Sequence, residues 1–397
     1  MLLERVDTYR RLNRPVQALH IVETVVAHEG WTPSLAGIAG TLRRATGDLE
    51  GAIAAWSLIP TPDGSVLRSM AQTQIELGYW PAAAETLIRL IYIAPDERWA
   101  ALNYGLLMAS INPQAARLAL EMAAEDNAYR TLANVILDTI RRNQDQPLLP
   151  MRVGVALAEQ SQWAFAEVAF ARAAALNDPY AEALAYLGLA RDRQGKDGGS
   201  SILRAVSLEP GNARVRYLQG VHLRAVGDAP GAIDALAQAA ALDPQNPAYY
   251  AELAQAYRDD HDLTQAEHWL LTAVAVSNNG PRYQEMLALF YADEGVNLTT
   301  SGLEALEQTL TGLPDSTDAR AGYGWALYTA GEVERGKAII EEVLERDSGN
   351  ARALYYKAQI LLDSGAEDEA LELLERVASG TSEFAVPART LLDDLRR

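Results

Sequence analysis

The chain contains no cysteine and only three lysines among its 397 residues. The absence of cysteine excludes disulfide bonds, thiol nucleophiles and metal sites built from thiolates. No apolar run approaches the roughly 18 residues of a membrane-spanning helix. The first twenty residues carry acidic side chains where a secretory signal would have its apolar core. We therefore expect a soluble, cytoplasmic protein without a membrane span.

Positive charge is also scarce. The 34 basic residues face 53 acidic ones, and the formal net charge is −19. A field of this sign repels phosphate backbones and anionic lipids over a long range, which argues against nucleic acid as a partner. The imbalance is greater in the C-terminal part, with 13 basic and 16 acidic residues in 1–146 but 21 and 37 in 147–397.

The sequence shows no catalytic constellation. The three lysines lack the glycine and hydroxyl residues of a phosphate-binding loop, and no nucleophile-elbow motif occurs. His261 and His268, with Glu267 beside the second, could face one another as metal ligands. The favoured interpretation places both histidines on the solvated surface, because His261 falls at an expected turn. We predict no enzymatic activity, no metal and no cofactor.

A repeating pattern runs through nearly the whole chain. Apolar residues make up 49%, and the 28 glycines and 17 prolines are spread along the length, which is typical of many short helices separated by turns. A small residue recurs inside amphipathic stretches at intervals of 31 to 36 residues, with a single interval of 49, and a period of this length indicates an array of helical pairs. These small residues are Gly40, Ala71, Gly105, Gly154, Gly188, Gly220, Ala254, Ala288, Gly324 and Ala358.

The clearest unit covers residues 213–246. Two apolar faces are separated by Gly227, which suits a positive φ, and by Asp228, which can cap the second helix. Gly220 and Ala232 are small because two helices that interlock must approach closely at these positions. The unit is therefore predicted to be a helix-turn-helix pair.

The small-residue, turn, alanine and proline positions of this unit resemble the tetratricopeptide repeat family, whose period is 34 residues. The resemblance implies an all-α fold, an α-α superhelix (a solenoid) of about eleven helix-turn-helix repeats with a C-terminal capping helix. The first repeat is expected in 1–32, a shortened second helix at 198–199 and two extra residues within 297–302. The other repeats are predicted to begin at Pro33, Gly64, Arg98, Pro147, Ala181, Ala213, Pro247, Pro281, Thr317 and Ala351.

The interval of 49 equals one repeat plus 15 residues and predicts an extra helix over 128–142, with an apolar face on Leu132, Val135, Ile136 and Thr139. We expect this unpaired helix to bend the array. The alternative, in which it pairs smoothly and leaves one continuous coil, stays open. The predicted organisation is an N-terminal block of about four repeats (1–127), the extra helix and junction (128–146), a C-terminal block of about seven repeats (147–383) and a capping helix (384–397).

The two ends of the array are expected to differ. Residues 387–395 place apolar side chains on one side and Asp393 and Asp394 on the other, which suits a lid. At the front, Leu2, Leu3 and Val6 open directly into the first repeat. We expect this edge to self-associate or to have lost a preceding segment, and the sequence leaves these alternatives open.

The resemblance also implies a partner-binding groove, because in this family the first helix of each repeat lines the concave face. Tryptophans at 80, 163 and 269 fall instead at positions where aromatic residues pack. The residues predicted to line the groove are Trp99, Asn103, Tyr186, Arg193, Arg214, Tyr217, Arg224, Arg258, Arg282, Trp325, Tyr328, Arg352, Tyr355 and Tyr356.

Two interpretations of the basic part of this groove stay open. Arg214, Arg224 and Arg258, beside Tyr186 and Tyr217, would attract an acidic or carboxylate-bearing peptide. In the alternative, which is favoured slightly, each arginine pairs with an acidic residue of the protein itself, such as Glu182, Glu252 or Asp259.

A second, aromatic patch is expected on Trp325, Tyr328, Tyr355 and Tyr356. It would anchor an apolar helix or an extended segment of a partner. Full burial of Trp325 between helices would remove the patch as a site.

Three functions compete at this stage. The leading hypothesis is a non-catalytic scaffold or adaptor that holds a peptide or protein segment in the groove. The second is a regulatory or substrate-presenting arm of an enzyme or of a secretion or assembly complex. The third, a helical-repeat RNA-binding protein, is opposed by the sign of the charge.

Overall fold

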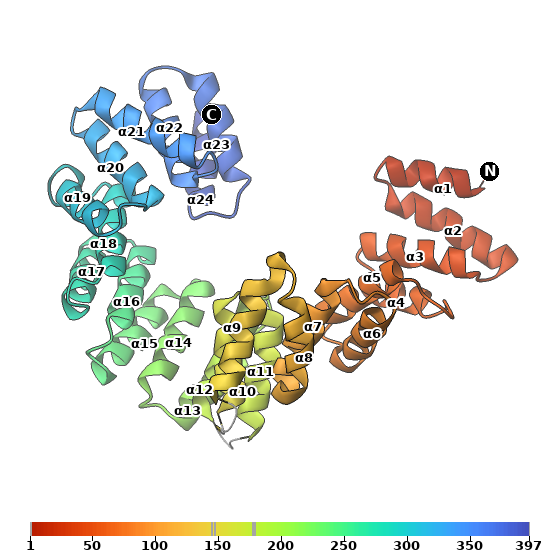
Figure 1. Ribbon diagram of the computed structural model, residues 1–397. Coiled ribbons are helices and arrows are strands. Elements are labelled where there is room, and N and C mark those ends of the chain that lie inside the picture. Colours follow the sequence, from red (N-terminus) through yellow and green to blue (C-terminus); the bar gives the residue numbers. More distant parts are fainter. Residues whose placement is uncertain (1, 144–145, 147, 177–179, 397) are drawn as a thin grey trace. The chain divides into compact units, whose positions relative to one another are not determined.

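The structure is a computed structural model that describes residues 2–143, 146, 148–176 and 180–396. Within these ranges the chain forms 24 α-helices and one short π-helix, with no strand (Figure 1). The all-α prediction is therefore confirmed. Contacts divide the chain into two compact units, residues 1–210 and 211–397, which we describe separately.

The first unit consists of helix pairs and one additional helix. Its helices are α1 (Leu2–Arg11), α2 (Pro15–Glu29), α3 (Pro33–Ala45), α4 (Leu49–Trp56), α5 (Gly64–Glu76), α6 (Trp80–Ile93), α7 (Arg98–Ile111), α8 (Pro113–Ala123), α9 (Asn127–Asn143), α10 (Leu149–Glu159), α11 (Trp163–Leu176), α12 (Ala181–Asp192) and α13 (Gly199–Leu208). Each pair packs through a short turn, and α9 stands outside this pairing.

The second unit continues the same arrangement and ends in a single helix. Its helices are α14 (Ala213–Ala225), α15 (Ala229–Leu242), α16 (Pro247–Asp259), α17 (Leu263–Val276), α18 (Pro281–Glu294), the π-helix η1 (Leu298–Gly302), α19 (Leu303–Gly312), α20 (Thr317–Thr329), α21 (Val333–Arg346), α22 (Ala351–Asp363), α23 (Glu367–Ala378) and α24 (Ala385–Leu395). With the first unit, the described chain holds eleven helix pairs, the number predicted.

The predicted repeat register agrees with the helix starts. A first helix begins at each predicted residue except Pro147, which lies outside the described residues; there α10 begins at Leu149. The starts have local causes. Pro247 and Pro281 occupy first-turn positions, where a missing N–H costs nothing. Asn212 caps α14 by accepting the N–H groups of Arg214 and Val215.

The helices of a pair approach as closely as the small residues predict. A Cβ atom added to Gly220 would lie 2.4 Å from Cγ of Leu236, so α14 and α15 leave no room for a methyl group there. At the turn between them, Gly227 has φ of 82°, and Asp228 accepts the N–H of Gly231 at 3.0 Å. The predicted turn and cap are confirmed.

A helix occupies the predicted extra position. α9 packs against α7, α8 and α10, while α7 also contacts α10 and α11. Ser110 of α7 donates to the carbonyl of Phe165 in α11 at 3.0 Å. The buried face of α9 differs from the predicted one, because of Leu132, Val135, Ile136 and Thr139 only Ile136 is buried. The buried residues of α9 are Ala133, Ile136, Leu137 and Ile140. The bend and the predicted block boundaries stay predictions.

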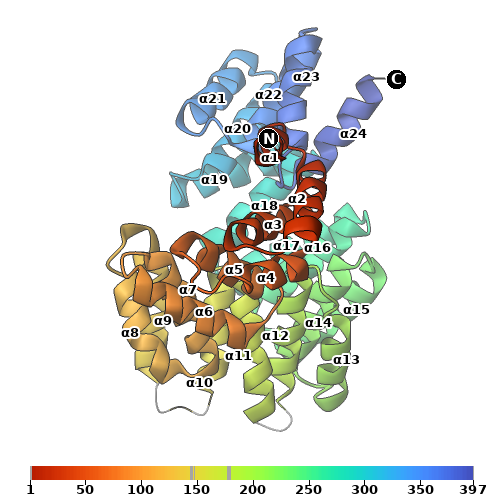
Figure 2. The same cartoon turned by 90° about the vertical axis from the view of Figure 1, so that its right-hand side faces the viewer.

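The last helix, α24, lies beside α23 at the end of the second unit (Figure 2). Ala388 and Leu392 are buried in the adjoining core, and Asp393 and Asp394 are exposed, so the predicted capping helix is confirmed.

At the N-terminal end, Val6 is 1% exposed and packs in a core cluster with residues of α2 and α3, which corrects its expected place at an open edge. The side chains of Leu2 and Leu3 lie outside the described residues.

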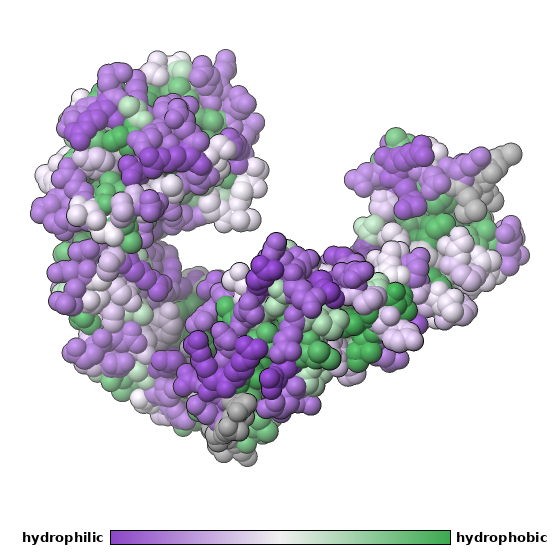
Figure 3. Space-filling view, in the orientation of Figure 1, coloured by the Kyte–Doolittle hydropathy of each residue, from purple (hydrophilic) through white to green (hydrophobic). Residues whose placement is uncertain are grey.

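The irregular repeats are accommodated locally. The segment 297–302, which carries the two extra residues, contains the five-residue π-helix η1, a wide helical turn before α19, and the shortened second helix α13 has 10 residues. The charge is divided between the units. The first has 19 basic and 23 acidic residues (net −4), and the second has 15 and 30 (net −15). Figure 3 shows hydrophilic residues over much of the visible surface of the second unit.

Candidate functional site: first-helix face and the α9–α10 groove

The first-helix face of the second unit is formed by α14, α16, α18, α20 and α22 (Figure 1). Each of these helices carries one half-buried residue at its ninth position, and these residues follow one another at intervals of 34 to 36. We call this set the ninth-position row. It consists of Val221, Gln255, Leu289, Trp325 and Gln359.

Ion pairs join neighbouring first helices beside this row. Nε of Arg224 lies 2.7 Å from Asp259 of α16, and its terminal nitrogen bonds to Glu252. Burial alone would lower the pKa of Arg224, but hydrogen bonds and charge from Asp259 and Glu252 raise it above its ordinary value. This guanidinium is therefore held by the protein's own carboxylates.

Arg258 repeats the arrangement one helix later. It bonds to Glu294 of α18 and lies 4.0 Å from Asp293. Arg214 is exposed and hydrogen-bonded to Tyr249. For Arg224 and Arg258 the structure thus matches the interpretation in which the arginines pair with acidic residues of the chain, and these two offer no free guanidinium to an acidic peptide.

The buried end of this face corrects two predicted groove residues. Arg352 and Tyr356 are 4% and 2% exposed, so they are core residues and not groove-lining ones. Arg352 bonds to Asp293 of α18 and to Glu383 before α24, the latter at 2.6 Å. The Tyr356 hydroxyl donates to the same carboxylate of Asp293 at 2.7 Å. Side chains of α18 and α22 therefore meet across α20.

The predicted aromatic patch is a stack and not an open surface. The ring of Trp325 lies between those of Tyr328 and Tyr356, at centroid distances of 5.7 and 5.1 Å and interplanar angles of 17° and 7°. Tyr355 packs on Phe384 at 5.2 Å. Trp325 is half-buried, so part of its ring stays accessible although it stacks with two tyrosines.

The remaining predicted residues divide between the two units. In the first, Arg68 lies over the Trp99 ring at 4.8 Å, and Asn103 donates to the carbonyl of Trp99. Tyr186 stacks on a phenylalanine, and Arg193 is exposed over a tryptophan ring. In the second, Tyr217 packs on Tyr249 at 5.2 Å, and Arg282 is exposed beside Tyr283. The residues are thus spread along the array, and most already have a partner within the chain.

The expected packing of three tryptophans holds in part. Each is half-buried beside another side chain. Trp80 lies 6.0 Å from the ring of Phe165, Trp269 stacks on Tyr250 at 5.7 Å, and Trp163 lies beneath Arg193 at 5.5 Å.

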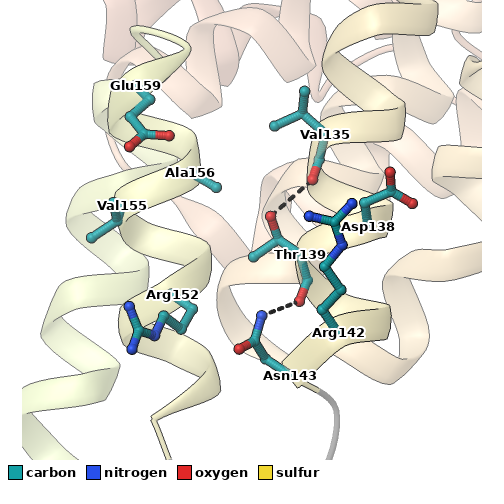
Figure 4. Close-up of a pocket in the computed structure, with 9 residues that line it drawn as sticks. All are labelled: Val135, Asp138, Thr139, Arg142, Asn143, Arg152, Val155, Ala156 and Glu159. Carbon is teal, nitrogen blue, oxygen red and sulfur yellow. Dashed lines mark hydrogen bonds between the residues drawn. The ribbon is translucent and has the colours of Figure 1, made fainter.

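A second candidate site lies in the first unit, between α9 and α10 (Figure 4). It is a groove of about 450 Å³, lined by side chains of both helices. Sequence reasoning missed it, because the residues that form it are unremarkable in either helix taken alone. We call it the α9–α10 groove; its lining residues are Val135, Asp138, Thr139, Arg142, Asn143, Arg152, Val155, Ala156 and Glu159.

The described residues contain no group of three or more histidine, aspartate or glutamate side chains arranged to hold a metal ion. His261 lies in the turn before α17 with φ of 62°, as predicted from the sequence, and Asp262 caps that helix. Across the described residues, no helix is long and apolar enough to cross a membrane.

Comparison with known proteins agrees with this architecture. Family models described as tetratricopeptide repeat match residues 223–290 and 324–383. The crystal structure of a tetratricopeptide repeat protein from Parabacteroides merdae is similar at 16% identity, with a TM-score of 0.50, over 62% of this chain and 97% of that one. Yeast Tom70 aligns at 16% identity and a TM-score of 0.44, over 100% of this chain and 95% of that one. Comparison with curated proteins gives no significant match.

The eleven helix pairs, their register and the family-model matches define an α-helical repeat protein. The chain contains tetratricopeptide repeats, as the sequence pattern predicted. Proteins built from these repeats generally act in protein–protein interaction, and the family models that match here are repeats, with no catalytic domain among them.

Proposed function

We propose that this protein is a non-catalytic interaction scaffold that holds a segment of a partner protein along the first-helix face of its second unit. The observation that carries the proposal is the ninth-position row, which offers one half-buried side chain per repeat at a nearly constant interval. Packed helices lie about 8–10 Å apart. A partner segment crossing the helices would thus meet a new side chain at each step.

The chemistry of the row suits a protein segment. Its amide side chains, Gln255 and Gln359, can donate to and accept from a backbone, and the apolar members Val221, Leu289 and Trp325 can cover apolar side chains. The flanking ion pairs hold the first helices at fixed positions before a partner arrives, which lowers the entropic cost of binding.

The proposal is tested by placing charge on the row. In the variant Gln255→Arg/Leu289→Arg, two long cationic side chains would occupy the surface on which the partner lies. The matched control is Leu242→Arg/Leu271→Arg, which introduces the same residue at exposed positions of the second helices α15 and α17. Circular dichroism and thermal unfolding establish that both variants fold.

Affinity capture from an extract of the source organism, followed by quantitative mass spectrometry, gives the readout. We expect partners captured by the wild type to be lost from the row variant and retained by the control. Equal recovery of partners by all three proteins would contradict the proposal that partners bind along the first-helix face. Capture of RNA with a steep salt dependence would instead support the helical-repeat RNA-binding alternative.

A further inference from the structure

The α9–α10 groove has the geometry of a binding cleft for a short protein segment. Each helix contributes residues at positions i, i+3, i+4 and i+7, which lie on one helical face and span about 10 Å at 1.5 Å per residue. The groove volume of about 450 Å³ falls within the range of ligand clefts. The α9 wall is Val135, Asp138, Thr139 and Arg142, and the α10 wall is Arg152, Val155, Ala156 and Glu159.

The two walls form a groove with distinct ends. α9 and α10 run in opposite directions, so Arg142 and Arg152 come from the same end, and Val135 and Glu159 lie toward the other (Figure 4). Between the ends lie the apolar Val155 and Ala156 on α10 and the polar Asp138 and Thr139 on α9. The groove therefore offers two arginines at one end, an apolar strip on its α10 wall in the middle and the Glu159 carboxylate toward the other end.

The arginine end has no counter-ion among the described residues. Asp138 pairs instead with the neighbouring Arg141 at 3.4 Å, and Arg141 also lies 3.6 Å from Glu121. Arg142 and Arg152 are both exposed, and neither forms an ion pair with a described acidic residue. Arg224, Arg258 and Arg352 are held by carboxylates of the chain, whereas Arg142 and Arg152 face one cleft without such a partner among the described residues, in a chain with a net charge of −19.

We propose that the α9–α10 groove binds a short segment of a partner protein, with an acidic side chain between Arg142 and Arg152 and an apolar side chain over Val155 and Ala156. Arginine forks bind carboxylates through paired charge-assisted hydrogen bonds. A simple anion would fill the arginine end and leave the apolar strip of Val155 and Ala156 uncovered, whereas a protein segment covers both. This site lies in the first unit and does not depend on the function proposed for the second.

The test is a peptide-display selection with the full chain as bait. An excess of the soluble variant Arg142→Glu/Arg152→Glu serves as competitor, so only peptides that need the two arginines are retained. The matched control, Arg89→Glu/Arg117→Glu, makes the same charge change at two exposed arginines on α6 and α8, outside the groove. Fluorescence anisotropy then measures the affinity of the recovered peptides for each protein.

We expect acidic peptides that bind the wild type and the control equally and bind the groove variant at least about tenfold more weakly, because two charge-assisted contacts are lost. If the Glu variant unfolds, Arg142→Gln/Arg152→Gln replaces it and should weaken binding in the same direction. Failure to recover any peptide, recovery of peptides without carboxylates, or equal weakening by the control would overturn the proposal. Full displacement of the peptides by inorganic phosphate at constant ionic strength would overturn it in favour of a simple anion site.

Discussion

Arg352 of α22 and Asp293 of α18 form an ion pair across the intervening helix α20, with side chains that are 4% and 6% exposed. Between them, Gly322 of α20 packs closely against α18, where an added Cβ would lie 3.1 Å from Cβ of Ala292. Burial alone would lower the pKa of Arg352, but the charge of Asp293 raises it above its ordinary value, so the guanidinium stays charged. The pair ties together the helices of alternate repeats.

Removing one member of this pair should destabilise the second unit strongly. We expect Arg352→Ala to lower the free energy of unfolding by about 3–5 kcal/mol, because it leaves Asp293 as a buried charge without its main partner. Arg346→Ala is the control. It removes an exposed pair with Glu342 and should cost less than about 1 kcal/mol. Urea unfolding measures both, and equal losses would show that burial of the pair is unimportant.

The close approach of α14 and α15 makes a second prediction. Alanine favours a helix over glycine by about 1 kcal/mol, yet Gly220→Ala should destabilise the protein by about 1–3 kcal/mol because the new methyl group collides with Leu236. Gly312→Ala is the control, because an added Cβ there meets nothing within 4 Å. Thermal unfolding should separate the two variants, and a stabilised Gly220→Ala protein would contradict the packing.

Glu167 should make the first unit sensitive to acid. Burial alone would raise the pKa of Glu167, but hydrogen bonds from Lys196 at 2.7 Å and Arg191 at 3.1 Å outweigh it and lower this pKa below its ordinary value. Since the folded-state pKa lies below the unfolded one, the stabilisation is present above the unfolded pKa and is lost as the pH falls through the folded value.

The pH dependence of unfolding tests this assignment. Between about pH 5 and pH 3, the wild type should lose stability more steeply than Glu167→Gln. Glu85→Gln, which changes an exposed carboxylate on α6, should follow the wild-type curve. If the stability of Glu167→Gln falls with pH in parallel with that of the wild type, the interactions of this carboxylate with Lys196 and Arg191 do not stabilise the fold.

His261 should be replaceable by glycine with a gain in stability. It has φ of 62° in the turn before α17, where the corresponding turn before α15 has Gly227. A left-handed conformation costs an ordinary residue about 1–2 kcal/mol, and part of this is offset by the larger entropy of glycine in the unfolded chain. We expect His261→Gly to stabilise the protein by about 0.5–1 kcal/mol in thermal unfolding. A lower melting temperature would indicate that the imidazole makes a stabilising contact.

The fold was predictable because its determinants repeat. Gly220 and Gly227 mark a close approach and a turn, and their counterparts recur in almost every repeat, so errors at one position are corrected by the others. The extra helix was predicted for the same reason, since 15 residues break an otherwise regular interval. Its buried face was not, because the partners of α9 are three helices and not one.

The candidate site was much less predictable. Family positions indicated that Arg352 and Tyr356 line a groove, but their burial depends on Asp293, which lies two repeats away. One signal was present in the sequence. Arg224 and Asp259 are 35 residues apart, as are Arg258 and Asp293, and this spacing of one repeat plus one residue could have indicated ion pairs between neighbouring first helices. The α9–α10 groove left no such signal because it requires the relative positions of two helices.

The uneven division of charge between the units has a consequence for their behaviour in solution. The second unit confines 30 carboxylates against 15 cations, whereas the first is nearly balanced. Dissolved ions screen such repulsion over about 10 Å at 0.1 M ionic strength. Low ionic strength should therefore destabilise the second unit more than the first. Added salt should raise the stability of the second unit most, so the salt dependence of unfolding distinguishes the two units.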